Sequence, residues 1–331
     1  MNYVKADAKA ASHAAFKGVV AAITTPFKAD LSVDEAGIRH NMRYLTQGLK
    51  VDGVFCTGVM GEFWSLTKEE RKRNVEIVCE EAKGRCTVIA HTGHHSAHET
   101  IELTKHAEQA GADFAILMTP YYPTAGEEMV FEWFKYVADR VDIGIWMFDT
   151  PFSNTAQLSP ELTARIAGLT NICGAKIARP VEHYAAVRKL VGDEIVLSSP
   201  FEGDFLMMIR DHGQRVHQSS ANPFLLQSAN RQPIRDYAQL ALAGRFAQAQ
   251  PISDSLKSAR AAGRKWLVEP FHHHKLIPIA AIKAWSELHG MAGGPVRPTL
   301  PQLTATERAA LRADVEATGI LDTIGRRSAA E

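Results

Sequence analysis

Strand-like and helix-like segments alternate along most of this chain, and this alternation constrains its fold more than any other feature. Short apolar runs predict strands, and the amphipathic stretches between them predict helices. The predicted strands are 18–24, 53–56, 87–91, 114–118, 143–148, 172–176, 195–198 and 216–219, and the predicted helices are 33–47, 67–82, 97–110, 127–139, 159–168, 181–191, 202–212 and 225–243. About eight such pairs favour an α/β fold in which the strands close into a (β/α)8 TIM barrel, rather than an open sheet.

Helical periodicity continues beyond the last predicted pair without another strand. It covers residues 246–262, 276–289 and 305–319, and predicts a C-terminal helical subdomain. We therefore expect a loosely ordered N-terminal leader at 1–16, the barrel at 17–244, and the helical subdomain with a tail at 245–331. A barrel of about 250 residues with such an addition explains a length of 331 residues.

Charge and composition exclude several classes of protein. Lysine plus arginine and aspartate plus glutamate both number 37, so no net field attracts nucleic acid or an anionic membrane. No apolar stretch approaches the roughly 20 residues of a membrane span, and the N-terminus lacks the apolar core of a signal peptide. The four cysteines lack C-x-x-C spacing, which suits a reducing compartment. We expect a cytoplasmic enzyme whose partner is a small molecule.

Lys176 lies in the apolar run 172–178, at the end of the predicted sixth strand. Desolvation lowers the pKa of a lysine, and the neutral amine can attack a carbonyl to form a Schiff base. Catalytic groups of TIM barrels lie at the carboxyl ends of the strands, so Lys176 is expected at the mouth of a pocket. The alternative is a structural lysine that reaches water or pairs with Glu202 or Asp204.

Other residues at the predicted strand ends are candidates for binding a substrate. The turn Gly58–Gly61 can direct successive backbone N–H groups at a carboxylate, although many turns contain glycine pairs. The candidate substrate-binding residues are Thr25, Val59, Met60, Phe148, Ser199 and Glu202.

A set of short motifs occurs in a fixed order across residues 17 to 305. The motifs are Thr24-Thr25-Pro26-Phe27, Gly58-Val59-Met60-Gly61-Glu62, Thr119-Pro120-Tyr121-Tyr122-Pro123, Gly174-Ala175-Lys176 and Gly293-Gly294-Pro295-Val296-Arg297-Pro298. In order and spacing they resemble the class I aldolases and lyases that include dihydrodipicolinate synthase and N-acetylneuraminate lyase. The resemblance implies a barrel with a C-terminal helical domain, assembled as a homotetramer, in which Lys176 forms an imine with a 2-oxo acid such as pyruvate.

Some positions depart from the pattern of those relatives. The second residue of their glycine turn and the one after it are usually hydroxylic, whereas this chain has Val59 and Met60. Their fifth strand ends in a tyrosine that shuttles protons, whereas this chain has Phe148, whose ring has no proton to give. The arginine that often follows that tyrosine is also missing, since residues 152–154 are Phe-Ser-Asn. We therefore expect an activity other than that of dihydrodipicolinate synthase itself.

Replacement acid/base groups follow the same strands. His91 and His95 follow the third strand, Asp149 follows Phe148, and Tyr122 matches the second tyrosine of the family. An imidazole suits proton transfer at neutral pH, whereas the alternative for each residue is a polar side chain satisfied at the barrel rim. The aromatic and apolar side chains nearby favour a substrate less polar than a sugar acid. They are Met60, Phe63, Trp64, Trp146, Phe148 and Phe152.

Histidine clusters at 91–98 and 272–274 raise the possibility of a metal site. Metal-dependent barrel hydrolases carry a His-x-His at the end of the first strand, where this chain has residues 22–25 without histidine. No phosphate loop, dinucleotide fingerprint or Gly-x-Ser-x-Gly motif is present. We expect neither a metal nor a cofactor.

The sequence as a whole predicts a Schiff-base lyase or aldolase that acts on a 2-oxo acid through Lys176. A 2-keto-3-deoxy acid dehydratase or hydratase would use the same imine. A ligand-binding barrel that has lost its proton relay and a metal-dependent hydrolase are the alternatives from other classes.

Overall fold

Eight parallel strands form the centre of the protein, as the predicted barrel requires. The computed structural model describes residues 2–122, 126–150 and 157–321. The strands are β1 (Gly18–Ala22), β2 (Gly53–Cys56), β3 (Thr87–His91), β4 (Phe114–Met118), β5 (Gly144–Asp149), β6 (Ile172–Ile177), β7 (Val196–Ser198) and β8 (Val216–Ser220). Their order is β7-β6-β5-β4-β3-β2-β1-β8, so β7 and β8 form the seam. The Ser198 hydroxyl bridges this seam, because it donates to the Val216 carbonyl at 2.8 Å and accepts from the Gln218 N–H at 2.8 Å.

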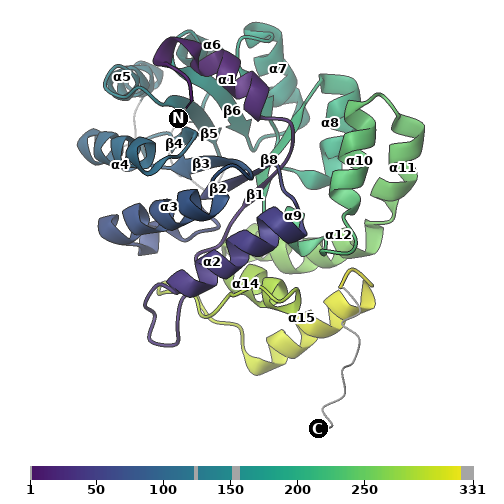
Figure 1. Cartoon of the computed structure of the whole chain (residues 1–331). Helices are drawn as coiled ribbons and strands as arrows, with labels where there is room; N and C mark the ends of the chain where they lie inside the picture. The colour runs from purple at the N-terminus through teal and green to yellow at the C-terminus, as the bar shows by residue number, and fades with distance from the viewer. Residues whose placement is uncertain (1, 123–125, 151–156, 322–331) are drawn as a thin grey trace.

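Helices surround the strands and bury the outer face of the barrel (Figure 1). They are α2 (Glu35–Arg43), α3 (Lys68–Ala82), α4 (Ala97–Ala110), α5 (Glu127–Ala138), α6 (Pro160–Ala167), α7 (Val181–Val191), α8 (Phe205–His212), α9 (Asn222–Leu225) and α10 (Pro233–Leu242). The prediction of one helix over 225–243 is wrong. Pro233 has no backbone N–H and fits the first turn of a helix, so α10 begins there, after the turn closed by Ser228 and Arg231.

The interior of the barrel explains why the sixth strand contains a glycine. Trp146 of β5 is fully buried, and a Cβ atom added to Gly174 of β6 would overlap its indole ring. Lys176 lies two residues further along β6 and pairs in register with Phe148 of β5. Glycine therefore leaves room for the indole ring. Side chains two residues apart lie on the same face of a strand, so Lys176 follows Gly174 on that face and reaches the mouth of the barrel.

The N-terminal residues are ordered, so the prediction of a loosely ordered leader at 1–16 is wrong for residues 2–16. They form η1 (Lys5–Asp7) and α1 (Ala8–Ala15). Ala8, Ser12 and Phe16 recur every four residues and are buried, which places one face of α1 against the barrel. The Trp146 indole N–H donates to the Ser12 hydroxyl at 3.1 Å. In Figure 1, α1 lies at the end of the barrel opposite α14 and α15, which are described next.

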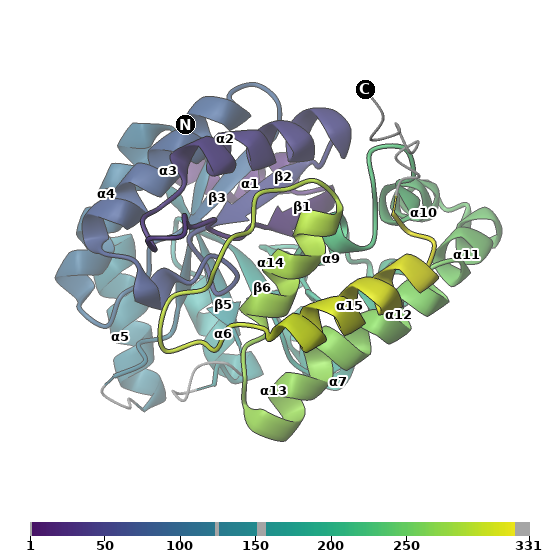
Figure 2. The same cartoon turned by 90° about the horizontal axis from the view of Figure 1, so that it is seen from below.

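The C-terminal region is helical, as expected. Its elements are α11 (Phe246–Asp254), α12 (Lys257–Gly263), η5 (Arg264–Val268, a π-helical turn), α13 (Glu269–His274), α14 (Ile279–Leu288) and α15 (Ala305–Ala317). The single helix expected over 246–262 is split after Asp254. Figure 2 shows that α13, α14 and α15 lie across the carboxyl end of the barrel. The domain limit at residue 245 stays a prediction. No helix in the described ranges has the length and apolar character to cross a membrane.

Candidate active site

A cavity of about 820 Å³ opens where the strands end. The barrel supplies its inner wall, and the C-terminal helices supply its outer wall. The inner wall includes Phe55, Val59, Met60, Phe148, Lys176, Ser219 and Ser220, and the outer wall includes Arg260, Arg264, Leu267, Val268, Phe271, His272, His273 and Ile282. Ligand sites combine such a mostly apolar lining with a few polar groups that orient the ligand.

Lys176 is the polar group at the base of this cavity. Its side chain is buried, and burial lowers the pKa of the ammonium to about 7. Its Nζ atom lies 3.5 Å from the Ser219 hydroxyl, and 4.2 Å and 5.0 Å from the ring centroids of Phe148 and Phe55. The expected alternative, a pair with Glu202 or Asp204, is absent from the described residues. A large fraction of Lys176 is therefore neutral near pH 7, as a nucleophilic amine must be.

The glycine turn after β2 borders the same cavity. The Gly61 N–H donates to the Gly58 carbonyl at 3.0 Å, and the Glu62 N–H donates to that of Val59 at 3.1 Å. The N–H groups of Val59 and Met60 have no acceptor among the described residues, and their side chains line the cavity. A Cβ atom at Gly58 would overlap the Phe55 ring, so only glycine fits there. The turn thus offers adjacent free donors beside Lys176, the arrangement that binds a carboxylate.

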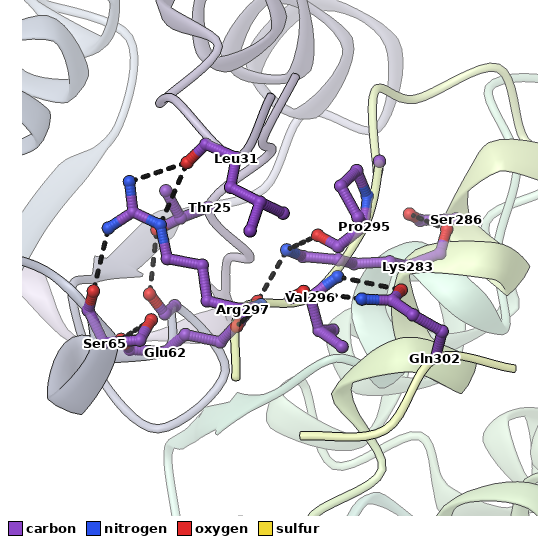
Figure 3. Close-up of polar contacts among 12 residues, drawn as sticks. Thr25, Leu31, Glu62, Ser65, Lys283, Ser286, Pro295, Val296, Arg297 and Gln302 are labelled. Carbon is purple, nitrogen blue, oxygen red and sulfur yellow. Dashed lines mark hydrogen bonds and ion pairs between the residues drawn. The ribbon is translucent and has the colours of Figure 1, made fainter. Parts of the chain in front are cut away.

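A buried ion pair anchors this turn to the C-terminal helices (Figure 3). Glu62 Oε1 lies 2.5 Å from Lys283 Nζ of α14, and both side chains are fully buried. Lys283 also donates to the Pro295 carbonyl at 2.8 Å, and the Arg297 N–H donates to Glu62 Oε2 at 3.0 Å. The Arg297 guanidinium in turn donates to the carbonyl groups of Leu31 and Ser65 (Figure 3). It also binds the carboxylate of Glu70. The motif around Arg297 therefore holds the turn in place.

Three of the predicted substrate-binding residues are not free to bind a ligand. Thr25 and Ser199 do not line the cavity, and Glu202 is paired with another side chain. The Thr25 hydroxyl donates to the Gly61 carbonyl at 2.9 Å, so Thr25 supports the turn. Ser199 is buried, and its N–H donates to the Gln214 side chain at 3.0 Å. Glu202 lines the cavity, but its carboxylate forms an ion pair with Arg260 at 2.7 Å. Val59, Met60 and Phe148 line the cavity, and their contact with a substrate stays a prediction.

The predicted acid/base residues lie outside the lining of the cavity. Asp149 is buried in a bidentate ion pair with Arg179, at 2.7 to 3.0 Å. The His91 ring is buried with Nδ1 3.1 Å from the Thr57 carbonyl, and burial, followed by the charge of Arg71, lowers its pKa well below the usual value. A proton-transfer role for these residues stays a prediction that the geometry does not favour.

The remaining acid/base candidates lie at the surface. His95 is exposed, and its Nδ1 lies 3.3 Å from the Tyr121 hydroxyl. Tyr122 is 75% exposed in the single chain. Phe152, expected beside the site, falls outside the described residues. The structure therefore brings Lys176 and Phe148 together at the cavity, but neither His95 nor Tyr122.

Sequence reasoning missed the Ser219 hydroxyl, which lies 3.5 Å from Lys176 Nζ, and the neighbouring Ser220. Ser219 and Ser220 end β8 and line the cavity. The Ser220 hydroxyl lies 3.1 Å from Nε2 of His217, a buried imidazole whose pKa burial lowers to about 3. The position of Ser219 and Ser220 at a strand end was the available signal. The outer wall was also missed, because Arg260, Leu267 and Phe271 follow the barrel in sequence.

The histidine clusters do not form a metal centre in the described parts of the chain. The rings of His94 and His95 are tilted relative to each other with centroids 4.0 Å apart, but no three His, Cys, Asp or Glu side chains gather around a common point there. The independence from metals stays a prediction.

Comparisons with known proteins agree with the fold. A profile of the dihydrodipicolinate synthetase family matches residues 15–318. The 4-hydroxy-tetrahydrodipicolinate synthase of Halorhodospira halophila is 31% identical over 312 residues, which are 92% of this chain and 98% of that protein. A protein of the same name from Methanothrix thermoacetophila is 42% identical over 165 residues, 49% of this chain and only 54% of that relative.

Solved structures give the same result. YagE, an E. coli K12 prophage protein of the dihydrodipicolinic acid synthase family in complex with pyruvate, superposes with a TM-score of 0.81 at 26% identity. The superposition covers 92% of this chain and 99% of YagE. The dihydrodipicolinate synthase of Aquifex aeolicus superposes with a TM-score of 0.79 at 25% identity, over 92% of this chain and 99% of that one.

Proposed function

Because this chain belongs to the dihydrodipicolinate synthetase family of class I, pyruvate-dependent aldolases, we propose that it is a Schiff-base lyase that forms an imine between Lys176 and a 2-oxo acid. The observation that carries the proposal is the state of Lys176. It is a buried amine with a pKa lowered to about 7, at the base of the cavity and beside the free N–H groups of Val59 and Met60.

The imine makes carbon–carbon bond chemistry possible at the neighbouring carbon. The Lys176 amine adds to the 2-oxo carbon, loss of water from the adduct gives an imine, and protonation of its nitrogen leaves an iminium ion. The N–H groups of Val59 and Met60 hold the carboxylate of the acid during these steps. Loss of a C3 proton gives an enamine, whose C3 attacks an aldehyde carbon while the aldehyde oxygen takes up a proton. Cleavage is the reverse: the C3–C4 electron pair passes to the iminium nitrogen as the C4 hydroxyl loses its proton.

Proton transfer has to proceed without the usual tyrosine, because the Phe148 ring, whose centroid lies 4.2 Å from Lys176 Nζ, carries no hydroxyl. The Ser219 hydroxyl, 3.5 Å from the same nitrogen, is better placed than His91 or Asp149 to move a proton there. Removing a group that transfers protons costs about 10²- to 10⁴-fold in kcat. Ser219→Ala and Asp149→Asn are therefore informative, with turnover and imine formation measured separately in each.

The proposal keeps the second substrate distinct from that of the relatives named 4-hydroxy-tetrahydrodipicolinate synthase. The support for this distinction is Phe148, which faces Lys176 where the resemblance implies a proton-shuttling tyrosine. Strong condensation of pyruvate with aspartate semialdehyde by the wild-type protein would contradict it. A dehydratase would use the same imine but eliminate the C4 hydroxyl, so product analysis separates the two reactions. The homotetramer and the cytoplasmic location belong to this proposal as well.

Crystals soaked with pyruvate test the proposed function. We expect density that runs continuously from Lys176 Nζ to the second carbon of pyruvate, with the carboxylate at the Val59 and Met60 N–H groups. Lys176→Ala should abolish turnover and leave the fold intact. Lys176→Gln is a second control, because it keeps much of the side-chain volume without the amine. Pyruvate bound without a covalent link, in a protein that shows no turnover, would support a ligand-binding barrel instead. Turnover by Lys176→Ala would point to a chemistry that does not use this amine.

A further inference from the structure

The cavity is far larger than a three-carbon acid needs. Its volume of about 820 Å³ lies toward the upper end of the range of about 300 to 1,000 Å³ that is typical of pockets for drug-sized ligands. Pyruvate at Lys176 and at the turn would occupy only its base. The remaining volume lies between the barrel mouth and the C-terminal helices, where a second reactant would extend from the imine.

The walls of this outer volume are predominantly apolar. Val268 and Phe201 line it and are 45% and 46% exposed, so they add exposed apolar surface to the cavity wall. Leu267 and Phe271 line it from η5 and α13, and Phe55 and Phe148 continue the apolar surface down to Lys176.

Two charged groups of the cavity wall, Glu202 and Arg260, neutralise each other. Glu202 accepts two hydrogen bonds from Arg260, at 2.7 and 2.9 Å, and one from the Tyr237 hydroxyl at 2.8 Å. Burial raises the pKa of Tyr237, which keeps this hydroxyl protonated. The Glu202 carboxylate thus has its partners within the protein and leaves little capacity to bind polyhydroxylated substrates. Glu269, Arg264, His272 and His273 supply the exposed polar rim further out.

The outer wall is held in a fixed orientation. On η5, the Trp266 N–H and the Lys265 ammonium both bind the Asp314 carboxylate of α15 at 2.7 Å. This anchoring turns Lys265 and Trp266 toward α15 and leaves Leu267 and Val268 in the cavity lining. The contacts with α15 therefore fix the apolar side of η5 in the cavity wall.

We propose that the second reactant of the Schiff-base reaction is a large apolar aldehyde, of the aryl class, whose ring binds between the barrel mouth and η5–α13. The inference rests on the proposed function and specifies the substrate class of the same site. An aryl ring fills the volume beside Val268 and Phe201 and contacts the aromatic side chains, where ring pairs gain from offset or edge-to-face packing. A small or hydroxylated aldehyde leaves this apolar wall in contact with water.

Condensation of pyruvate with an aldehyde series tests the inference. The series is acetaldehyde, glyceraldehyde, benzaldehyde and 2-naphthaldehyde, and kcat/KM is measured for each. We expect benzaldehyde and 2-naphthaldehyde to exceed both small aldehydes by at least about tenfold, as burial of one large apolar group predicts. Equal or lower values for the aryl aldehydes would overturn the inference.

Variants of the outer wall test where the ring of the aldehyde binds. Val268→Asp places a carboxylate on the exposed part of the wall and should lower kcat/KM for 2-naphthaldehyde about tenfold, with little change for acetaldehyde. Leu267→Ser should act in the same direction. Ala261→Asp is the matched control, because Ala261 is an exposed residue of the preceding α12 that does not line this cavity. An unchanged aryl preference in both wall variants would overturn the inference.

Borohydride trapping of pyruvate, measured in every variant, separates this inference from the proposed function. If neither the wild-type protein nor any variant traps pyruvate, the Schiff-base proposal itself fails. If trapping at Lys176 is normal but the aryl preference is missing, only the substrate class is wrong.

Discussion

The buried pair of Glu62 and Lys283 gives a sharp prediction about the turn that faces the substrate. Lys283→Met removes the ammonium but leaves the Glu62 carboxylate fully buried, with the Arg297 N–H as its remaining partner. An unpaired buried charge of this kind costs about 3 to 5 kcal/mol of folding free energy. The double variant Glu62→Gln with Lys283→Met replaces the whole pair and keeps an acceptor for Arg297. It should lie within about 2 kcal/mol of the wild type, because a complete neutral replacement of a buried pair is often tolerated.

Urea unfolding followed by circular dichroism, with reversibility checked, measures these differences. The difference between the single and double variants measures the cost of leaving the Glu62 carboxylate buried without its cation. Because the pair anchors the turn that carries Val59 and Met60, the double variant should also raise the KM for pyruvate while leaving the pH dependence of Lys176 unchanged. The surface pair Lys135 and Asp139 supplies the control, since Lys135→Met should cost less than about 1 kcal/mol. A similarly small cost for Lys283→Met would refute the reasoning.

Other predictions concern Lys176 and the strands beside it. The rate of imine formation should rise with pH, reach half its maximum near pH 7 and level off above it, because the reactive neutral amine predominates above the lowered pKa of Lys176. Stopped-flow measurements that still rise steeply at pH 9 would show an ordinary lysine. Gly174→Ala should destabilise the fold by about 1 to 3 kcal/mol in urea unfolding, because its Cβ atom overlaps Trp146; an unchanged midpoint would contradict this packing. Phe148→Tyr should keep pyruvate trapping without gaining condensation with aspartate semialdehyde, and a strong gain would show that this hydroxyl alone sets the reaction.

The sequence predicted the barrel well because strand and helix signals are local. β4 and α4 were predicted with the bounds that the structure shows, since an apolar run or an amphipathic stretch ends there at clear turn residues. Local signals failed where tertiary contacts decide. The buried face of α1 is short and weakly apolar. Ser12 of this helix and Phe16, which follows it, contact Trp146, which lies far away in sequence.

The candidate site was predictable only in part, for the same reason. Lys176 was identified from its apolar strand and the position of that strand in the barrel, both of which are local features. The pairs that determine which polar groups remain available are not local: Arg260 binds Glu202, and Lys283 binds Glu62 from the opposite end of the chain. From the sequence, Asp149 was expected to be available for proton transfer, because its partner Arg179 lies in a different connection, between β6 and α7.

Whether Lys176 forms an imine decides the proposed function, and borohydride reduction with pyruvate measures this. The chain is incubated with pyruvate, reduced, digested and analysed by mass spectrometry, with Lys176→Ala as the control. We predict a pyruvate-derived mass increase on Lys176 that the variant lacks. A label on Lys283 or Lys275 instead, or no label on Lys176 from any of a broad panel of 2-oxo acids, would contradict the Schiff-base assignment.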